Sequence, residues 1–375
     1  MLIFRVKNKQ QKTKIKETRT KRQEPRNLGF NYNKMQRTEI SKYGEFGLIK
    51  HLTEKFKISN ESTLYGVGDD AAVLDYKQKQ VLVTTDLLLE GVHFDLVYVP
   101  LKHLGYKAAV VNFSDIYAMN GQPKQITVSL GVSKRFVVED LEELYAGIAL
   151  ACETYGVDLV GGDTSASLTG LTISITCIGE AEKEKIVYRN GAKPNDLICV
   201  SGDLGSAYMG LQLLEREKIV FAANSEAQPD FEGMDYILKR QLKPEARKDV
   251  IQALKDKGIV PTAMMDISDG LSSELIHICT QSNAGCRIYE DKIPINYQAV
   301  VMADELNMSI VTAALNGGED YELVFTVSMA DYEKIITVEG VGIVGNITKP
   351  EFGLHLIGRE GEELEMKAQG WNSLK

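Results

Sequence analysis

The strongest constraint on the fold is a series of short segments that combine carboxylates with glycine, serine or threonine, mostly where an apolar run ends. The first segment, residues 66–75, places two glycines, which permit a tight turn, before the adjacent acids Asp69 and Asp70. Adjacent carboxylates repel each other, so a fold keeps them together where they are solvated or meet a cation. Further segments of this kind lie at residues 84–86, 112–115, 161–164, 265–270 and 317–320. We therefore expect the rest of the chain to be a scaffold that brings these carboxylates together.

The length and composition are those of a globular protein with an ordinary core. The chain has 375 residues, of which 44% are hydrophobic and 25% are charged, and this is enough for two domains of usual size. It contains no run of about 18 apolar residues, so we expect no transmembrane helix and no membrane partner. The five cysteines show no CxxC spacing and are interpreted as small buried residues in a reducing compartment, which predicts a cytoplasmic location.

Charge is distributed unevenly along the chain. Residues 1–34 contain eleven Lys or Arg against Glu17 and Glu24, while the whole chain has a net charge of −9, so the remainder carries −18. The acidic body beyond residue 34 is unsuited to nucleic acid, so no nucleic-acid partner is expected for it, and it suits work with divalent cations. Residues 1–34 are expected to form a disordered and dispensable basic extension before a natural start at Met35. A nucleic-acid arm and a targeting peptide are the alternatives, and targeting is weakened because the segment lacks serine.

Hydrophobic periodicity predicts alternating strands and helices. In the first half, helices are expected near residues 46–56, 101–120 and 138–155, and strands at 80–86, 126–132 and 171–180. In the second half, strands are expected at 197–200, 263–267, 286–289, 321–327, 341–347 and 354–357, and helices at 206–215, 244–257 and 270–280, with a loop at 218–235. A turn signal containing Gly191 and Pro194 places a domain boundary near 182–195. We predict an α/β (α+β) fold with α/β domains at 35–185 and 186–375.

The oxygen-rich segments are suited to magnesium and phosphate. Asp and Thr oxygens are hard ligands, and Mg²⁺ binds a few carboxylates together with waters and substrate phosphates. Five or six clustered Asp residues exceed what one ion requires, so several ions around a polyphosphate would account for them, as phosphoryl transfer demands. The chain lacks a GxxxxGK[ST] P-loop and the HRD and DFG kinase signatures. Each segment alone also fits an ordinary turn or helix cap, and a cation-stabilised binding protein is the non-enzyme alternative.

Taken together, the segments resemble the thiamine-monophosphate kinase family. Residues 38–46, 66–72, 84–94, 107–121, 161–164, 189–196, 266–273 and 317–325 follow that family's order and spacing, over residues from about 36 to 375. The glycine–acid junctions are shared with the wider aminoimidazole ribonucleotide synthetase superfamily, whereas segment 90–94, segment 317–322 and a terminal Trp are more specific. Selenide water dikinase would need a reactive Cys or Sec near its start, and the first cysteine here is Cys152. The carbamoyl-dehydratase maturation protein would end in Cys, and this chain ends in Lys375.

The resemblance implies a homodimer, in which the first domain of each subunit pairs across the dimer axis through a mixed sheet flanked by helices and the second domain completes the substrate site. The implied reaction is the transfer of a phosphoryl group from ATP to thiamine monophosphate, giving thiamine diphosphate and ADP. The transfer would be direct and in line, assisted by several Mg²⁺ ions. No covalent nucleophile or catalytic base is expected, because the acceptor phosphate is already ionised at neutral pH.

The resemblance also assigns roles to individual residues. The positions that match the family's metal ligands are Asp70, Thr84, Thr85, Asp86, Asp115, Asp163, Asp266 and Asp269. Those that match its ATP contacts are Tyr145, Gly162, Asp163, Arg189 and Ser268. Those that match its thiamine monophosphate contacts are His93, Glu319 and Trp371. The residue types agree with these roles, since a guanidinium suits phosphate oxygens and an indole stacks on a cationic ring; anchoring of the C-terminus is the structural alternative for Trp371.

Overall fold

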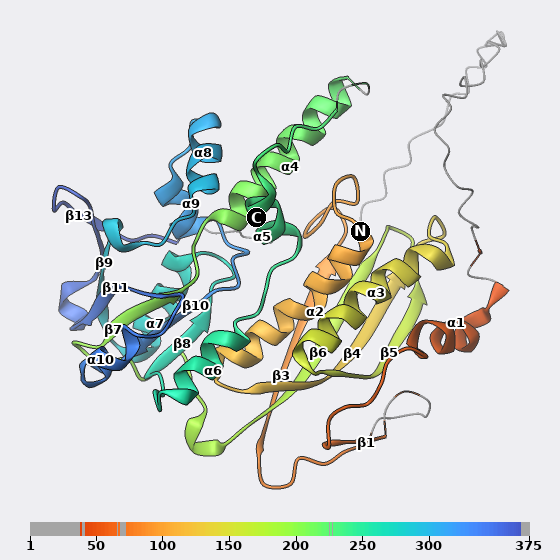
Figure 1. Cartoon of the computed structure of the whole chain (residues 1–375), viewed down its shortest axis with the longest axis horizontal. Helices are drawn as coiled ribbons and strands as arrows, with labels where there is room; N and C mark the ends of the chain where they lie inside the picture. Colours follow the sequence, from red (N-terminus) through yellow and green to blue (C-terminus); the bar gives the residue numbers. More distant parts are fainter. Residues whose placement is uncertain are drawn as a thin grey trace, which may run out of the picture. The chain divides into compact units, whose positions relative to one another are not determined.

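The computed structural model describes residues 38–39, 42–65, 67, 73–224, 226 and 228–368. The extension expected at residues 1–34, the acids Asp69 and Asp70, and Trp371 lie outside the described residues. Within these ranges, no helix combines the length and apolar character needed to cross a bilayer. The strands of the described part form a four-stranded sheet, a seven-stranded sheet and a small antiparallel pair of β1 (Thr63–Tyr65) with β2 (Val73–Leu74) (Figure 1).

The four-stranded sheet mixes parallel with antiparallel pairs. Its strands, in sheet order, are β3 (Gln80–Leu89), β6 (Thr172–Ala181), β4 (Gln122–Val132) and β5 (Asp158–Ala166). Strand β6 is antiparallel to both β3 and β4, whereas β4 and β5 are parallel and are joined through helix α3 (Val138–Tyr155). A parallel pair requires such a crossover because both of its strands start at the same edge of the sheet.

Helices α2 (Leu101–Ala118) and α3 pack against each other and cover one face of this sheet (Figure 1). Alternate residues of β6, among them Ile173, Ile175 and Cys177, are fully buried on that face. Helix α2 is buried over most of its length, because it also contacts strand β8 (Ala263–Asp266) of the second sheet. It therefore lies where the two sheets meet.

The opposite face of the four-stranded sheet keeps apolar residues exposed. In β3, Leu82 and Leu88 are buried, whereas Val81, Val83 and Leu87 point the other way and are exposed. The side chain of Val83 retains 66% of its accessible surface. This edge strand therefore carries apolar residues on both of its faces, and those of the outer face are exposed.

The seven-stranded sheet is formed by the second half of the chain. Its order is β13 (Glu363–Glu365), β12 (Leu354–Ile357), β9 (Gly285–Tyr289), β11 (Val341–Thr348), β7 (Leu197–Ser201), β10 (Leu323–Val327) and β8. Every residue of β7, β10 and β8 is buried, which explains why these strands are continuous apolar runs. Only β12 and β9 are parallel among the pairs of this sheet in the described residues.

The remaining helices belong mainly to the second half. They are α1 (Gly44–Thr53), α4 (Ser206–Ala223), α5 (Asp235–Leu242), α6 (Lys248–Asp256), α7 (Leu271–Ser282), α8 (Tyr297–Glu305), α9 (Ile310–Asn316) and α10 (Tyr332–Ile335). Short 3-10 helices lie at η2 (Lys183–Lys185), η3 (Glu290–Lys292), η4 (Met329–Asp331) and η5 (Pro350–Phe352). The main core is continuous across both sheets, since Phe113 and Ile175 share it with Leu323 and Phe325 of β10.

The predicted α/β (α+β) class is confirmed, and several predicted bounds are wrong. Helix α4 continues to Ala223, whereas a loop was predicted from residue 218. The prediction failed because the last turns of α4 carry exposed apolar residues such as Ile219, which do not follow the hydrophobic pattern of a helix. Helix α6 begins at Lys248 rather than at Pro244, since Arg247 has a non-helical backbone. Residues 84–86 and 161–164 were expected near strand ends, but they lie inside the long strands β3 and β5.

Candidate active site

Five carboxylates converge where helix α2 meets the second sheet. Asp86 comes from the middle of β3, Asp115 from α2, and Asp266 from the end of β8. Asp269 follows β8 in the loop before α7, and Glu319 lies in the loop between α9 and β10. We call these five residues the carboxylate cluster.

The carboxylates of the cluster influence one another electrostatically. Burial, with further contributions from Asp115 and Glu319, raises the pKa of Asp86 to about 6. Burial, followed by the charge of Asp115, raises the pKa of Asp266 to about 8. Burial also raises the pKa of Asp269, and Glu319 adds to the effect. Ionisation of Asp86, Asp266 and Asp269 is therefore disfavoured in the folded protein, and a bound cation would favour it.

Hydrogen bonds from hydroxyl groups fix two of the carboxylates. The side chains of Thr84 and Asp86 point to the same, helix-covered face of β3, because they are two residues apart in a strand. Thr84 Oγ1 donates to Asp115 Oδ2 over 2.5 Å. Ser114 Oγ donates to Asp266 Oδ2 over 2.6 Å. Ser114 and Asp115, which are consecutive in α2, thus bind the seven-stranded sheet and the four-stranded sheet, respectively.

The side chain of Thr85 does not join the cluster. It lies on the opposite, exposed face of β3, where its Oγ1 donates to the carbonyl of Ile175 over 3.1 Å and accepts from Thr176 Oγ1 over 3.1 Å. Within one subunit this side chain therefore lies on the opposite face of β3 from Thr84 and Asp86, and its expected role as a metal ligand stays a prediction.

A buried glutamate shapes the loop that carries Asp269. Glu274 Oε1 accepts hydrogen bonds from the backbone N–H groups of Ser268 (3.0 Å) and Asp269 (2.8 Å). Burial raises the pKa of Glu274 to about 7. Gly270 completes the loop with a φ of +112°, and a Cβ there would lie 2.7 Å from the Cα of Asn316. Only glycine meets both requirements.

The loop of Glu319 adopts an unusual backbone conformation. Gly318, Glu319 and Tyr321 have φ angles of +72°, +63° and +51°, which L side chains rarely adopt. The backbone N–H groups of Glu319 and Tyr321 donate to the carbonyls of Ser268 (2.7 Å) and Ile267 (2.9 Å). These bonds tie the loop of Glu319 to the loop of Asp269.

The side chain of Lys107 brings a positive charge to the cluster at Glu319. The ammonium of Lys107 forms an ion pair with Glu319 Oε2 and donates to the carbonyl of Gln241 over 3.0 Å. Burial by itself would raise the pKa of Glu319, but the charge and hydrogen bond of Lys107 hold it below its ordinary value. Arg189 lies near enough to Asp115 for its charge to oppose the rise in that residue's pKa.

Other predicted site residues lie elsewhere in the described structure. Asp163 is exposed on β5 beside Ser129 of β4, at the opposite edge of the sheet from β3. Gly162 packs closely against β4, since a Cβ there would lie 1.9 Å from the Val128 carbonyl oxygen. One subunit therefore does not bring these two residues beside Asp86.

Tyr145 and His93 also have local partners. Tyr145 is buried in α3, with its ring edge-on to Phe56 at a centroid distance of 6.3 Å. His93 follows β3 in a turn, where its Nδ1 accepts from the backbone N–H of Leu89 over 3.0 Å. Asp70 and Trp371 lie outside the described residues.

Several residues around the cluster were not predicted. Ser114, Glu274 and Tyr321 were given no role, and Lys107 was noted only as a polar residue in an apolar helix. Lys107 precedes Asp115 by eight residues, which places both on one face of α2. That spacing was the available signal for Lys107, whereas its partner Glu319 is 212 positions away.

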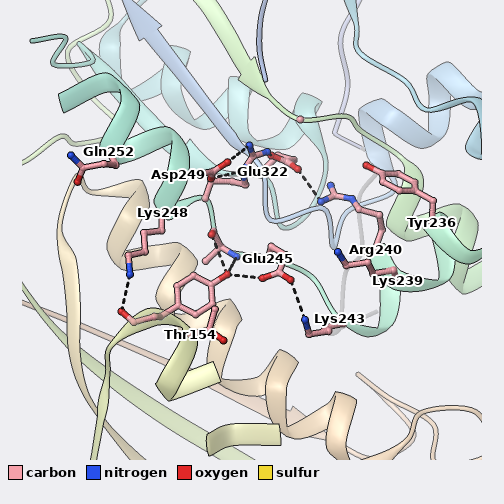
Figure 2. Close-up of a pocket in the computed structure, with 14 residues that line it drawn as sticks. Thr154, Tyr236, Lys239, Arg240, Lys243, Glu245, Lys248, Asp249, Gln252 and Glu322 are labelled. Atoms are coloured by element: carbon pink, nitrogen blue, oxygen red, sulfur yellow. Dashed lines mark hydrogen bonds and ion pairs between the residues drawn. The ribbon is translucent and has the colours of Figure 1, made fainter. Parts of the chain in front are cut away.

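A cavity of about 670 Å³ lies apart from the carboxylate cluster and shares no residue with it. Its charged lining consists of Lys239, Arg240, Lys243, Glu245, Arg247, Lys248, Asp249 and Glu322 (Figure 2). Most of these cations already have acidic partners, as Figure 2 shows for Arg240 with Glu322 at 2.9 Å and Lys243 with Glu245 at 3.3 Å. Arg240 also donates to the carbonyl of Asp320 over 3.1 Å. Arg240 thus connects the cavity lining to the loop that carries Glu319.

Comparisons with known proteins agree with this architecture. Residues 68–181 match the family model "AIR synthase related protein, N-terminal domain". The thiamine-monophosphate kinase of Aquifex aeolicus is 35% identical over 325 residues, covering 84% of this chain and 99% of the relative. That of Bacillus subtilis is 34% identical over 340 residues, covering 88% and 99%. A solved structure of AaThiL complexed with AMPPCP and TMP is similar with a TM-score of 0.69 and 32% identity, covering 89% of this chain and 98% of that one.

Proposed function

Because this chain belongs to the thiamine-monophosphate kinase family, we propose that it transfers a phosphoryl group from ATP to thiamine monophosphate, giving thiamine diphosphate and ADP. The observation that carries the proposal is the convergence of Asp86, Asp115, Asp266 and Asp269 with Glu319 at the junction of the two sheets. The ligands of the similar AaThiL structure, AMPPCP and TMP, support the two substrate classes.

The donor set fits Mg²⁺ held jointly by protein and substrate. Within the described ranges, no group of three or more His, Cys, Asp or Glu is arranged so that it could hold a metal ion, so substrate phosphates would have to supply further ligands. Mg²⁺ commonly binds through one or two carboxylates, with waters and phosphates as its other ligands. Asp86, Asp115, Asp266 and Asp269 supply such oxygens, and we propose these residues, with Asp70, Thr84, Thr85 and Asp163, as ligands of several Mg²⁺ ions. Bound Mg²⁺ offsets the negative charge of the phosphates.

The residues of the chain act by positioning and by charge. The acceptor is a phosphate that is ionised at neutral pH, so direct in-line transfer needs no general base and no covalent intermediate. Arg189, whose charge reaches Asp115, is proposed to bind ATP phosphate oxygens together with Ser268. Glu319, His93 and Trp371 are proposed to bind thiamine monophosphate.

We also propose that the protein works as a homodimer. The exposed apolar residues Val81, Val83 and Leu87 support pairing through the outer face of the four-stranded sheet. The same face carries Thr85 and Asp163. Pairing there would bring these two residues to the subunit boundary. Gly162 of β5 and Tyr145 of α3 are the other proposed ATP contacts.

The proposed location is the cytoplasm, without nucleic-acid partners. All five cysteines are buried free thiols, as is usual in a reducing compartment. The charge of −18 beyond residue 34 repels a phosphate backbone.

A single assay tests the reaction. The purified protein is incubated with ATP and Mg²⁺, with and without thiamine monophosphate, and ADP and thiamine diphosphate are separated by chromatography. The proposal expects equimolar ADP and thiamine diphosphate only when thiamine monophosphate is present. A cation-stabilised binding protein would release no ADP in either case. Release of ADP without thiamine diphosphate would show a different acceptor.

A further inference from the structure

Lys107 is buried in the middle of α2, with 7% of its surface exposed. Its neighbours Tyr106 and Ala108 belong to the hydrophobic core. An ammonium group in such a place is stable only when partners compensate its charge. Two partners lie on elements far from α2 in the sequence, namely the carboxylate of Glu319 and the backbone carbonyl of Gln241.

Glu319 is held at both of its carboxylate oxygens. Oε2 pairs with Lys107 and lies 3.4 Å from the Gln241 side-chain amide, which donates to it. Oε1 accepts from the hydroxyl of Tyr321 over 3.2 Å. Helix α2, helix α5 and the loop itself each contribute a donor, so the carboxylate has a defined orientation.

The rest of this loop is secured without Lys107. The Asp320 carboxylate accepts from the backbone N–H of Gly205 over 2.8 Å, and Glu322 pairs with Arg240 at 2.9 Å. Together with the backbone bonds to residues 267 and 268, these contacts hold the loop in place. Lys107 instead forms an ion pair with Glu319, whose side chain is the one in this loop that belongs to the carboxylate cluster.

We propose that Lys107 is a positioning residue of the transfer reaction, which holds the Glu319 carboxylate in the orientation that receives thiamine monophosphate. This inference rests on the proposed function, because it takes Glu319 as a contact to that substrate. It assigns Lys107 a role in substrate recognition through Glu319 and no contact with the transferred phosphoryl group. Its effect should therefore fall on one substrate and depend on the presence of Glu319.

The experiment is a double-mutant cycle in steady-state kinetics. Wild type, Lys107→Met, Glu319→Gln and the double variant are compared for the KM of each substrate and for kcat. Lys107→Met should raise the KM for thiamine monophosphate at least tenfold and change the KM for ATP less than threefold. The double variant should be no worse than Glu319→Gln alone, because Lys107 acts through Glu319. Lys102→Met, at an exposed position of the same helix, is the matched control and should resemble wild type.

Two results would overturn the inference. Equal losses toward both substrates would indicate a general structural role, and additive losses in the double variant would indicate that Lys107 acts independently of Glu319. A melting curve of each variant identifies misfolding. If Lys107→Met is folded, Lys107→Arg, which retains the charge, should show a smaller rise in the KM for thiamine monophosphate.

If the wild type fails to phosphorylate thiamine monophosphate, the proposed function itself fails. The pairing of Lys107 with Glu319 is then measured separately, as non-additivity of the melting temperatures in the same four proteins.

Discussion

Ser114 of α2 donates a 2.6 Å hydrogen bond to the carboxylate of Asp266 at the end of β8. The next residue, Asp115, accepts from Thr84 of β3 over 2.5 Å. One turn of one helix therefore connects both sheets at the carboxylate cluster. Ser114 is fully buried and Asp266 nearly so, so both hydrogen-bonded side chains lie in the interior where the two sheets meet.

Replacing a single cluster carboxylate should abolish transfer and leave the fold intact. We expect Asp86→Asn or Asp115→Asn to lower kcat by more than about a hundredfold, because each removes charge that positions the cation and phosphates. The melting temperature of the metal-free variants should equal or slightly exceed that of wild type, since repulsion within the cluster is relieved. Asp304→Asn, at an exposed site in α8, serves as the control. Turnover within about tenfold of wild type would argue against a role in metal binding.

The metal-free protein should lose stability as the pH rises from about 5 to 8. The pKa values of Asp86 and Asp266 are raised in the folded state from 3.8 to about 6 and about 8, mainly by burial. Between these values and the ordinary one, the folded protein binds more protons than the unfolded chain, so the free energy of unfolding falls as pH increases. Carboxylates with lowered pKa values, such as Glu319, stop contributing to the free energy of unfolding only at lower pH. They therefore do not oppose this trend.

Melting curves in EDTA across this pH range check the prediction. The melting temperature should fall by several degrees between pH 5 and pH 8, and Mg²⁺ should restore part of the loss at pH 8 by binding the ionised carboxylates. Asp266→Asn should flatten the profile. A melting temperature that rises steadily to pH 8 in wild type would show that these carboxylates are not destabilised in the folded protein.

Gly270 should be essential to the geometry of Asp269. Gly270→Ala introduces a Cβ 2.7 Å from the Asn316 Cα at a φ of +112°, so the loop must shift. We expect a loss of kcat together with a lower melting temperature. Gly258→Ala is a matched control, because that glycine also has a positive φ, +63°, yet a Cβ there meets nothing within 4 Å. It should cost about 1 kcal/mol of stability and leave turnover unchanged. Equal effects of the two substitutions on turnover would contradict the role given to this loop.

Particular residues show how far sequence reasoning reaches. The predicted helix at 138–155 coincides with α3, since its apolar residues repeat at helical spacing. Asp115 is close enough to Asp86 and Asp266 to raise the pKa values of both, and Asp86 and Asp269 are both influenced by Glu319. Their individual roles stay predictions. The side chain of Thr85 was grouped with its neighbours Thr84 and Asp86, because the motif alone does not reveal that β3 runs straight through it and alternates faces.

Contacts between segments far apart in the chain could not be predicted from the sequence. The ion pair of Lys107 with Glu319 depends on how α2 crosses the second sheet, and the two residues are 212 positions apart. The helix α5, which supplies Gln241 and Arg240, was not predicted at all. Its short sequence follows a polar stretch and lacks a clear start signal, so its position depends on packing against α4.

The exposed face of β3 yields the prediction about assembly. If the outer face of the four-stranded sheet pairs with a second subunit, Val83→Lys should convert the dimer into a monomer, because it buries a charge in an apolar contact. Ile219→Lys, on α4, is the matched control, since Ile219 is 67% exposed and Val83 is 66% exposed. Sedimentation velocity gives the oligomeric state of each variant, and activity is measured at the same protein concentration.

Because Thr85 and Asp163 share the outer face, loss of the dimer should also raise the KM for ATP. A Val83→Lys protein that stays dimeric would place the subunit contact on another surface, and a monomeric one with unchanged ATP kinetics would separate Asp163 from the ATP site.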